Sequence, residues 1–258
     1  MSFNLANAWK RGGLLLALLA TFCVMQPSAA ATQGMMGRHP AMGEETIAVG
    51  VDGTLYVLVA PVQRGMGREF GRVVLLALDL ATLRVRWRYA LEDENEVLLV
   101  SRPVVSRDGT VYFTVSEMME FCSSLDETRV LPNARLLAVR DGTLKWSYEF
   151  DAPFASHPVL SPEGMLFVTT GAMGIERMPG PWDLRSQFVA LEDRGTSAAV
   201  RARLDLGAYA VSAPIVGPHP TSAWAIYVAG ERMGMRMEHE MLLFIITPDF
   251  RTRTVRLR

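Results

Sequence analysis

At 258 residues, with 50% hydrophobic and 21% charged residues, the chain has the composition of an ordinary globular protein and is long enough to bury one substantial core. That composition excludes intrinsic disorder as a description of the whole chain. The formal net charge is −1, and without residues 1–31 the chain keeps 24 basic and 27 acidic residues. A charge of −3 offers no basic surface for nucleic acid or anionic lipid.

Residues 1–31 have the pattern of a secretory signal peptide. Lys10 and Arg11 precede an apolar run over 14–25, and small residues follow up to Ala31, which is the order of regions in a signal peptide. The apolar run is shorter than the roughly 20 residues that a membrane-spanning helix needs. We therefore expect cleavage near Ala31 and a periplasmic or otherwise exported product without a membrane span.

A unit of about 56 residues recurs along the rest of the chain. A Ser-x-Pro sequence followed by two apolar residues begins at Ser101, Ser156 and Ser212, so that successive starts are 55 and 56 residues apart. One further step towards the N-terminus reaches Glu45, which an apolar stretch without the proline follows. A fixed period of this size is typical of stacked repeats. The sequence predicts a linker over 32–44 and then four units, over about 45–100, 101–155, 156–211 and 212–258.

Each unit has the pattern of four antiparallel strands. After the short first strand comes a turn that contains glycine in the first three units, and then a stretch with two-residue alternation, as in a β-hairpin. We expect second strands over 54–59, 110–115, 165–169 and 224–228, and third strands over 73–78, 134–139, 187–191 and 241–246. A fourth strand follows each of them. Four-stranded antiparallel repeats predict an all-β fold, a four-bladed β-propeller that follows the signal peptide.

The turn after the third strand resembles a known blade motif. The stretch from Ala77 to Trp87 is similar to the Ala-x-Asp-x-x-Thr-Gly-x-x-x-Trp motif of pyrroloquinoline-quinone-type (PQQ-like) propeller repeats, with Leu83 in place of glycine. A shorter version runs from Ala138 to Trp146, and the third unit keeps the alanine but not the tryptophan. The resemblance implies that the alanine and tryptophan pack one blade against the next.

The resemblance implies a fold, but it does not imply an enzymatic activity. Quinone-dependent dehydrogenases of the family usually have eight blades and a calcium-bound cofactor under a vicinal disulfide, whereas other members are outer-membrane assembly scaffolds that bind proteins. This chain has no adjacent cysteines and half of those blades. It also lacks a His-Glu-x-x-His pair, a Gly-rich phosphate loop and a Gly-x-Ser-x-Gly elbow. We therefore expect no catalytic residue and no bound cofactor, and PQQ least of all.

Methionines gather in or beside the connections between second and third strands. Equivalent connections of successive blades emerge on one face of a propeller, so the pattern predicts a methionine-rich surface for a protein partner. The linker holds three more methionines, with His39 among them. The predicted partner-binding residues are Met66, Met118, Met119, Met173, Met178 and Met241.

The densest methionine stretch runs from Met233 to Met241. In an extended strand its odd-numbered positions project four thioethers and one imidazole to one side. Thioethers are soft ligands that favour Cu(I), and imidazole is compatible with it. The stretch therefore predicts a Cu(I) or Ag(I) site made by Met233, Met235, Met237 and His239. Packing of these side chains on the blade, or a plastic protein-binding surface, explains the same pattern.

Three functions follow from the sequence, in descending order. The first is an exported, non-enzymatic scaffold that binds a protein partner through its methionine-rich face. The second is a periplasmic protein that binds a soft metal, and the third is a small quinone-dependent oxidoreductase. The repeat count leaves two assemblies open, since four blades either close on themselves or pair as a homodimer with eight blades.

Overall fold

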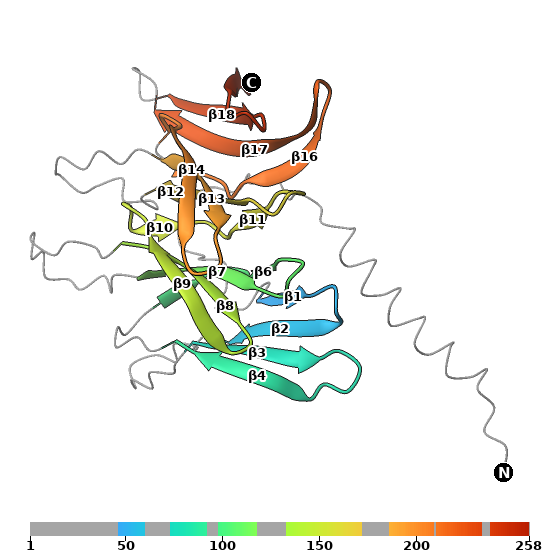
Figure 1. Cartoon of the computed structure of the whole chain (residues 1–258). Helices are drawn as coiled ribbons and strands as arrows, with labels where there is room; N and C mark the ends of the chain where they lie inside the picture. Colours follow the sequence, from blue (N-terminus) through green and yellow to red (C-terminus); the bar gives the residue numbers. More distant parts are fainter. Residues whose placement is uncertain are drawn as a thin grey trace, which may run out of the picture. The chain divides into compact units, whose positions relative to one another are not determined.

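The computed structural model describes residues 46–59, 73–91, 98–117, 133–171, 186–208, 210–233 and 238–257 (Figure 1). The chain separates into two units, 1–40 and 41–258, and every described residue belongs to the second. All regular elements in these ranges are β-strands. Within the same ranges, no helix has the length and apolar character that crossing a membrane requires.

The strands form four antiparallel sheets, which we name A to D in chain order. Sheet A consists of β1 (Ile47–Val49), β2 (Thr54–Val59), β3 (Val74–Asp79) and β4 (Val85–Ala90). Sheet B consists of β5 (Leu98–Val100), β6 (Val104–Val105), β7 (Val111–Glu117), β8 (Arg135–Arg140) and β9 (Thr143–Glu149). Sheet C consists of β10 (Phe154–Ala155), β11 (Val159–Leu160), β12 (Leu166–Gly171), β13 (Gln187–Asp193) and β14 (Ala198–Asp205). Sheet D consists of β15 (Ala210–Val211), β16 (Ile215–His219), β17 (Ser222–Met233), β18 (His239–Ile246) and β19 (Thr252–Arg256).

In every sheet the strands lie in chain order, and the predicted all-β, propeller-like arrangement of four-stranded antiparallel sheets is confirmed. In sheets B, C and D the first strand is broken into two short pieces that pair with the same neighbour. The break falls on the Ser-x-Pro sequence. At Ser156 the backbone amide donates to the carbonyl of Thr169 at 2.8 Å, and the side-chain oxygen accepts the Thr169 amide at 3.0 Å. The serine hydroxyl thus takes the place of a ladder carbonyl, and Ser101 and Ser212 do the same.

The turns that open the first three sheets need glycine for conformational reasons. Gly53, Gly109 and Gly164 have φ of 73°, 81° and 89°, values that residues with a β-carbon rarely adopt. Asp52 accepts the Thr54 amide at 3.1 Å, and Asp108 accepts the Thr110 amide at 3.2 Å. An aspartate, a left-handed glycine and a threonine therefore build the same turn twice.

The alanine of the blade motif marks a bulge. The pairing of the third and fourth strands shifts register immediately after Ala77, Ala138 and Ala190. All three alanines are fully buried, and a residue this small lets the neighbouring sheet approach. Trp146 is 5% exposed within the cluster that joins sheets B and C, whereas Trp87 is only half-buried.

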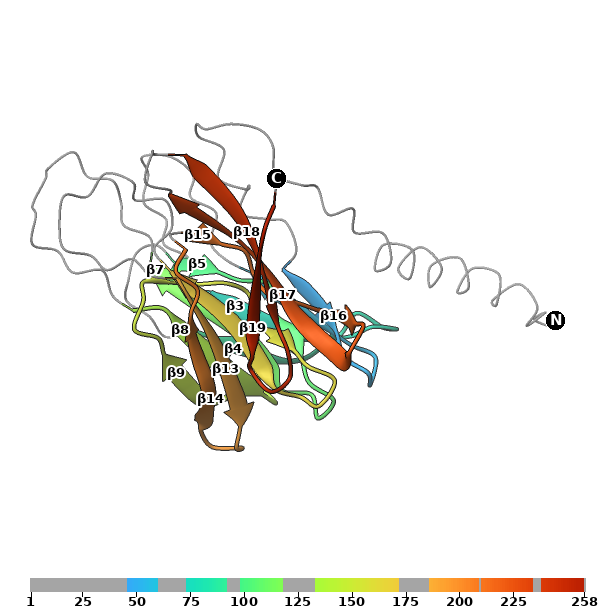
Figure 2. The same ribbon diagram turned by 90° about the horizontal axis from the view of Figure 1, so that it is seen from above.

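Three hydrophobic clusters join consecutive sheets. One links A to B around Leu75 and Phe113, one links B to C around Leu136 and Val168, and one links C to D around Phe188. Each sheet thus has a leading face towards the sheet before it in the chain and a trailing face towards the sheet after it. Strand contacts follow the same succession (Figure 1). Figure 2 views this succession from the side of sheet D.

Candidate functional site

The second and third strands of all four sheets open at one edge of the described unit. The last paired residues are Val59 with Val74, Val115 with Arg135, Thr170 with Gln187 and Met233 with His239. We call this edge, where β2, β7, β12 and β17 end and β3, β8, β13 and β18 begin, the loop edge (Figure 1).

Contacts between neighbouring sheets fix this common direction. The hydroxyl of Thr114, near the end of β7, donates to the carbonyl of Ser156 at 3.0 Å. In the next sheet, the hydroxyl of Thr169 donates to the carbonyl of Ser212 at 2.8 Å. Because Ser156 and Ser212 pair with the second strands of their own sheets, β7, β12 and β17 end side by side.

Most of the sequence-predicted site residues lie outside the described residues. This holds for the methionines of the linker and for most of those in the connections, namely Met35, Met36, Met42, Met66, Met118, Met119, Met173, Met178, Met235 and Met237. Of the predicted metal ligands, the described residues include His239 and the backbone of Met233. Of the predicted partner-binding residues they include Met241, which is 45% exposed.

The described part of the fourth connection is a regular hairpin. Its register sets Met233 opposite His239 and Glu231 opposite Met241. The Nδ1 atom of His239 contacts Oε1 of Glu231. On the alternate positions Glu240 accepts from Arg232 at 3.2 Å and from Arg256 at 2.8 Å.

This hairpin has the alternation that a strand imposes. His239 and Met241 occupy one side and Glu240 the other, as the odd-numbered pattern predicts for these positions. A carboxylate at Nδ1 fixes the orientation of an imidazole and is the usual partner behind a metal-bound histidine. Within the described ranges, no three side chains of His, Cys, Asp or Glu converge as a metal site.

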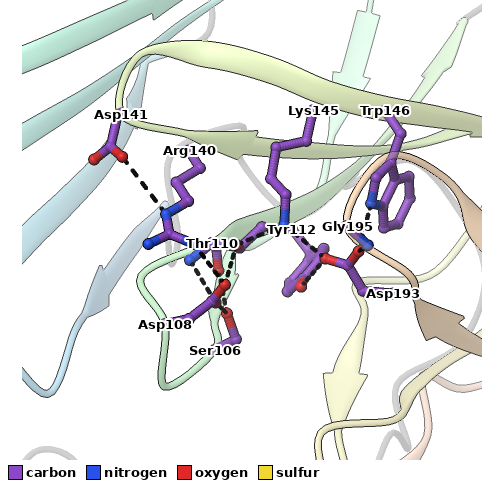
Figure 3. Close-up of polar contacts among 10 residues, drawn as sticks. All are labelled: Ser106, Asp108, Thr110, Tyr112, Arg140, Asp141, Lys145, Trp146, Asp193 and Gly195. Carbon is purple, nitrogen blue, oxygen red and sulfur yellow. Dashed lines mark hydrogen bonds and ion pairs between the residues drawn. The ribbon is translucent and has the colours of Figure 1, made fainter.

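A polar cluster joins sheets B and C away from the loop edge (Figure 3). Its centre is Asp193, at the end of β13. Oδ2 of Asp193 accepts the Tyr112 hydroxyl at 2.6 Å and the Lys145 ammonium at 3.1 Å. Oδ1 accepts Nε1 of Trp146 at 2.9 Å and the amide of Gly195 at 2.6 Å. Three donors from sheet B thus hold one carboxylate of sheet C.

The cluster continues into sheet B through the turn before β7. The ammonium of Lys145 also donates to Oγ1 of Thr110 at 3.2 Å. Asp108 accepts from Thr110, from the hydroxyl of Ser106 and from Arg140 at 2.9 Å (Figure 3). Thr110 is fully buried, so these bonds satisfy polar groups that the neighbouring sheet hides from water.

The contacts of the cluster keep Asp193 ionised and Tyr112 protonated. Burial alone would raise the pKa of Asp193, but the hydrogen bonds from Tyr112, Gly195, Trp146 and Lys145 outweigh it, so the pKa of Asp193 is lowered. Burial, together with the bond to Asp193, raises the pKa of Tyr112 well above its ordinary value of 10.0. A tyrosine that holds its proton so firmly is a poor general acid, and a carboxylate whose pKa is lowered by several donors is a poor general base. The arrangement favours a structural clamp between two sheets.

The sequence pattern did not identify the clamp. Lys145 and Asp193 are 48 residues apart, and Tyr112 and Asp193 are 81 apart. One sequence feature could have indicated the clamp, namely an aspartate three residues after the alanine of the motif. It is Asp141 in the second unit and Asp193 in the third.

Comparison with known proteins yields no family, since no protein-family model matches the chain and no curated protein matches its sequence.

Proposed function

We propose that this chain is an exported, non-enzymatic scaffold of four PQQ-like propeller blades, which binds a protein partner through the connections at its loop edge. The observation that supports the proposal is the common end at which the second and third strands of all four sheets open. These connections and the adjoining strand ends contain nine methionines in the sequence. A surface of flexible, polarisable thioethers adapts to the shape of a protein partner.

The polar contacts among the described residues fit a binding role. The best-formed polar cluster, around Asp193, satisfies its own donors and acceptors and lies between sheets. Its bonds stabilise the array on which the loop edge is built. A rigid array that carries variable connections is a common way to present a binding surface.

A crosslinking comparison tests this role. The tagged protein is crosslinked in the exported fraction of its native host, and the crosslinked partner is identified and quantified. One variant changes five connection methionines to serine, namely Met66, Met118, Met119, Met173 and Met178. The matched control changes exposed apolar residues at the opposite edge to serine, namely Leu80, Leu83 and Leu144. We expect the partner to be lost from the first variant and kept by the control, and equal recovery by both would contradict the proposal.

Binding of a soft metal is the second candidate. It is supported by the contact of His239 with Glu231 and by the register of Met233 opposite His239. A competition titration with Cu(I) compares the wild type with Met235→Ala/Met237→Ala/His239→Ala. The control is His219→Ala, a histidine of the same sheet that bonds the hydroxyl of Ser222. Equal affinity in the wild type and the triple variant would end the metal hypothesis.

A further inference from the structure

The leading face of sheet A is apolar and uncovered by any described residue. Ile47 and Val49 of β1 are 55% and 52% exposed, and across the sheet they pair with Val57 and Leu55. The same face continues on β3, where Leu76 pairs with Val57 and Leu78 with Leu55.

The repeat shows what this face does elsewhere. One period later, Leu55 and Val57 correspond to Val111 and Phe113 of sheet B, which are both 0% exposed. Those two residues lie in the cluster with Leu75 and Ala77 of sheet A. At each of the three internal junctions the leading face of one sheet is buried by the trailing face of the sheet before it.

The trailing face of sheet D is also uncovered by any described residue. Its trailing face includes Tyr227, Leu243 and Ile245, which are half-buried, and Ile215, which is 63% exposed. The residues at the position of Ile245 in sheets B and C are Ala138 and Ala190, and both are 0% exposed because the next sheet covers them.

The two faces do not meet within the described part of the chain. Sheets B and C lie between A and D, and no cluster among the described residues joins A to D (Figure 1). Apolar side chains exposed together on one sheet face are costly in water and mark interaction surfaces. The described sheets therefore have two uncovered faces, the leading face of sheet A and the trailing face of sheet D. Together these are the two halves of one more junction like the three between consecutive sheets.

We propose that a second copy of this chain covers both faces, with sheet D of each copy packed on sheet A of the other. Two identical head-to-tail junctions then close a twofold ring of eight sheets. Charge complementarity agrees with this pairing. Arg253 of β19 occupies the position in sheet D that Trp146 occupies in sheet B, because Arg253 pairs with Ile245 as Trp146 pairs with Ala138. In sheet B that position donates to the turn after β13. The equivalent turn of sheet A begins at Asp79, whose Oδ2 accepts from Arg86 at 2.7 Å and would take Arg253 of the second copy as a further donor.

Paired surface variants test the ring. Light scattering after size-exclusion chromatography gives the molar mass of the purified full chain, for which we expect twice the 28.5 kDa of one copy. A leading-face variant carries Ile47→Asp and Val49→Asp, and a trailing-face variant carries Ile215→Asp and Val255→Asp. Each variant alone should have half the wild-type mass, because each destroys both junctions of its own ring.

Mixing distinguishes head-to-tail pairing from every other contact. An equal mixture of the two variants retains one intact junction and should recover a species of twice the monomer mass. A control with Leu144→Asp and Val200→Asp changes two apolar residues of similar exposure on internal sheets, 39% and 41% exposed, and should keep the wild-type mass. Near-ultraviolet circular dichroism checks the fold. If the leading-face variant does not fold, Val49→Ser replaces it, and if the trailing-face variant does not fold, Val255→Ser replaces it.

Three results would overturn the proposal. The first is a monomeric wild type at the highest soluble concentration. The second is a trailing-face variant that keeps the wild-type mass, since contact between two leading faces would then hold the copies together. The third is a mixture that remains monomeric although each variant is folded.

Discussion

The carboxylate of Asp193 joins sheets B and C, and its replacement by an amide isolates that role. In Asp193→Asn the amide oxygen can still accept from Trp146 and Gly195, as Oδ1 does at 2.9 Å and 2.6 Å. The amide NH₂ then replaces Oδ2, which accepts from Tyr112 at 2.6 Å and from Lys145 at 3.1 Å. The substitution therefore removes an ion pair. It also places the amide NH₂, a hydrogen-bond donor, opposite the Lys145 ammonium, which is itself a donor.

The expected loss follows from the burial of this pair. The side chains of Lys145 and Asp193 are 18% and 13% exposed, so the pair is worth more than the roughly 0–1 kcal/mol of a surface ion pair. A hydrogen bond to a charged group contributes about 1.5–3 kcal/mol. We expect Asp193→Asn to lower the free energy of unfolding by about 2–4 kcal/mol, measured by urea denaturation at pH 7.

Asp141→Asn is the matched control. Asp141 occupies the same position of sheet B, but its side chain is 82% exposed. Its φ of 50° lies in the left-handed region that asparagine also adopts readily. The control should change the free energy of unfolding by less than about 0.5 kcal/mol. Equal denaturation midpoints for Asp141→Asn and Asp193→Asn would refute the clamp.

The same substitution should change the response to acid. The pKa of Asp193 lies below its ordinary value of 3.8 because the hydrogen bonds to its carboxylate outweigh burial. A carboxyl group with a lower pKa in the folded than in the unfolded state adds stability above the unfolded pKa, and this contribution is lost as the pH falls through the folded pKa. The wild type should therefore lose stability more steeply than Asp193→Asn below about pH 5, and parallel pH profiles would contradict this reasoning.

Four further substitutions test the packing and the turns. Trp146 is 5% exposed and Trp87 is half-buried, so Trp146→Ala should cost about 3–5 kcal/mol and Trp87→Ala clearly less in paired denaturation curves. Ser156→Ala removes the acceptor that lies 3.0 Å from the Thr169 amide and should cost about 1–2 kcal/mol, with faster hydrogen exchange of that amide. Leu83→Gly relieves a backbone with φ of 56° and should raise stability by about 1 kcal/mol, seen as a higher thermal midpoint.

The strands were predictable because their signal is local. The predicted second strand at 54–59 matches β2 at both ends, and the other predicted second and third strands overlap β7, β12, β17, β3, β8, β13 and β18. Alternation of apolar and polar side chains follows directly from the two-residue period of a strand. The largest difference is β17, which extends to Met233 and draws the base of the fourth connection into the sheet.

Side-chain partners across the sheets were not predictable in this way. The clamp at Asp193 depends on how sheets B and C approach each other, and that approach depends on buried residues such as Ala138 that carry no polar signal. In the sequence, Ser-x-Pro marked the start of a unit, and its effect on the strand ladder was not predicted. The residue that repairs the ladder is the preceding serine, as Ser156 shows, because its hydroxyl substitutes for a carbonyl. The methionine connections stay a prediction, since they lie outside the described residues.

The polar contacts at the junctions also explain how similar sheets are kept in order. Apolar leading and trailing faces are nearly interchangeable between repeats, so burial alone would tolerate the pairing of B with D. At the B–C junction the indole of Trp146 donates from the trailing face to Asp193, whereas at the C–D junction Trp224 donates from the leading face to Glu163 at 2.9 Å. Pairing B with D would leave Trp146 without the carboxylate of sheet C, and a buried donor without an acceptor is costly. A junction between two copies would employ Arg253 at the position of Trp146, so it would differ from all three internal junctions and would not compete with them.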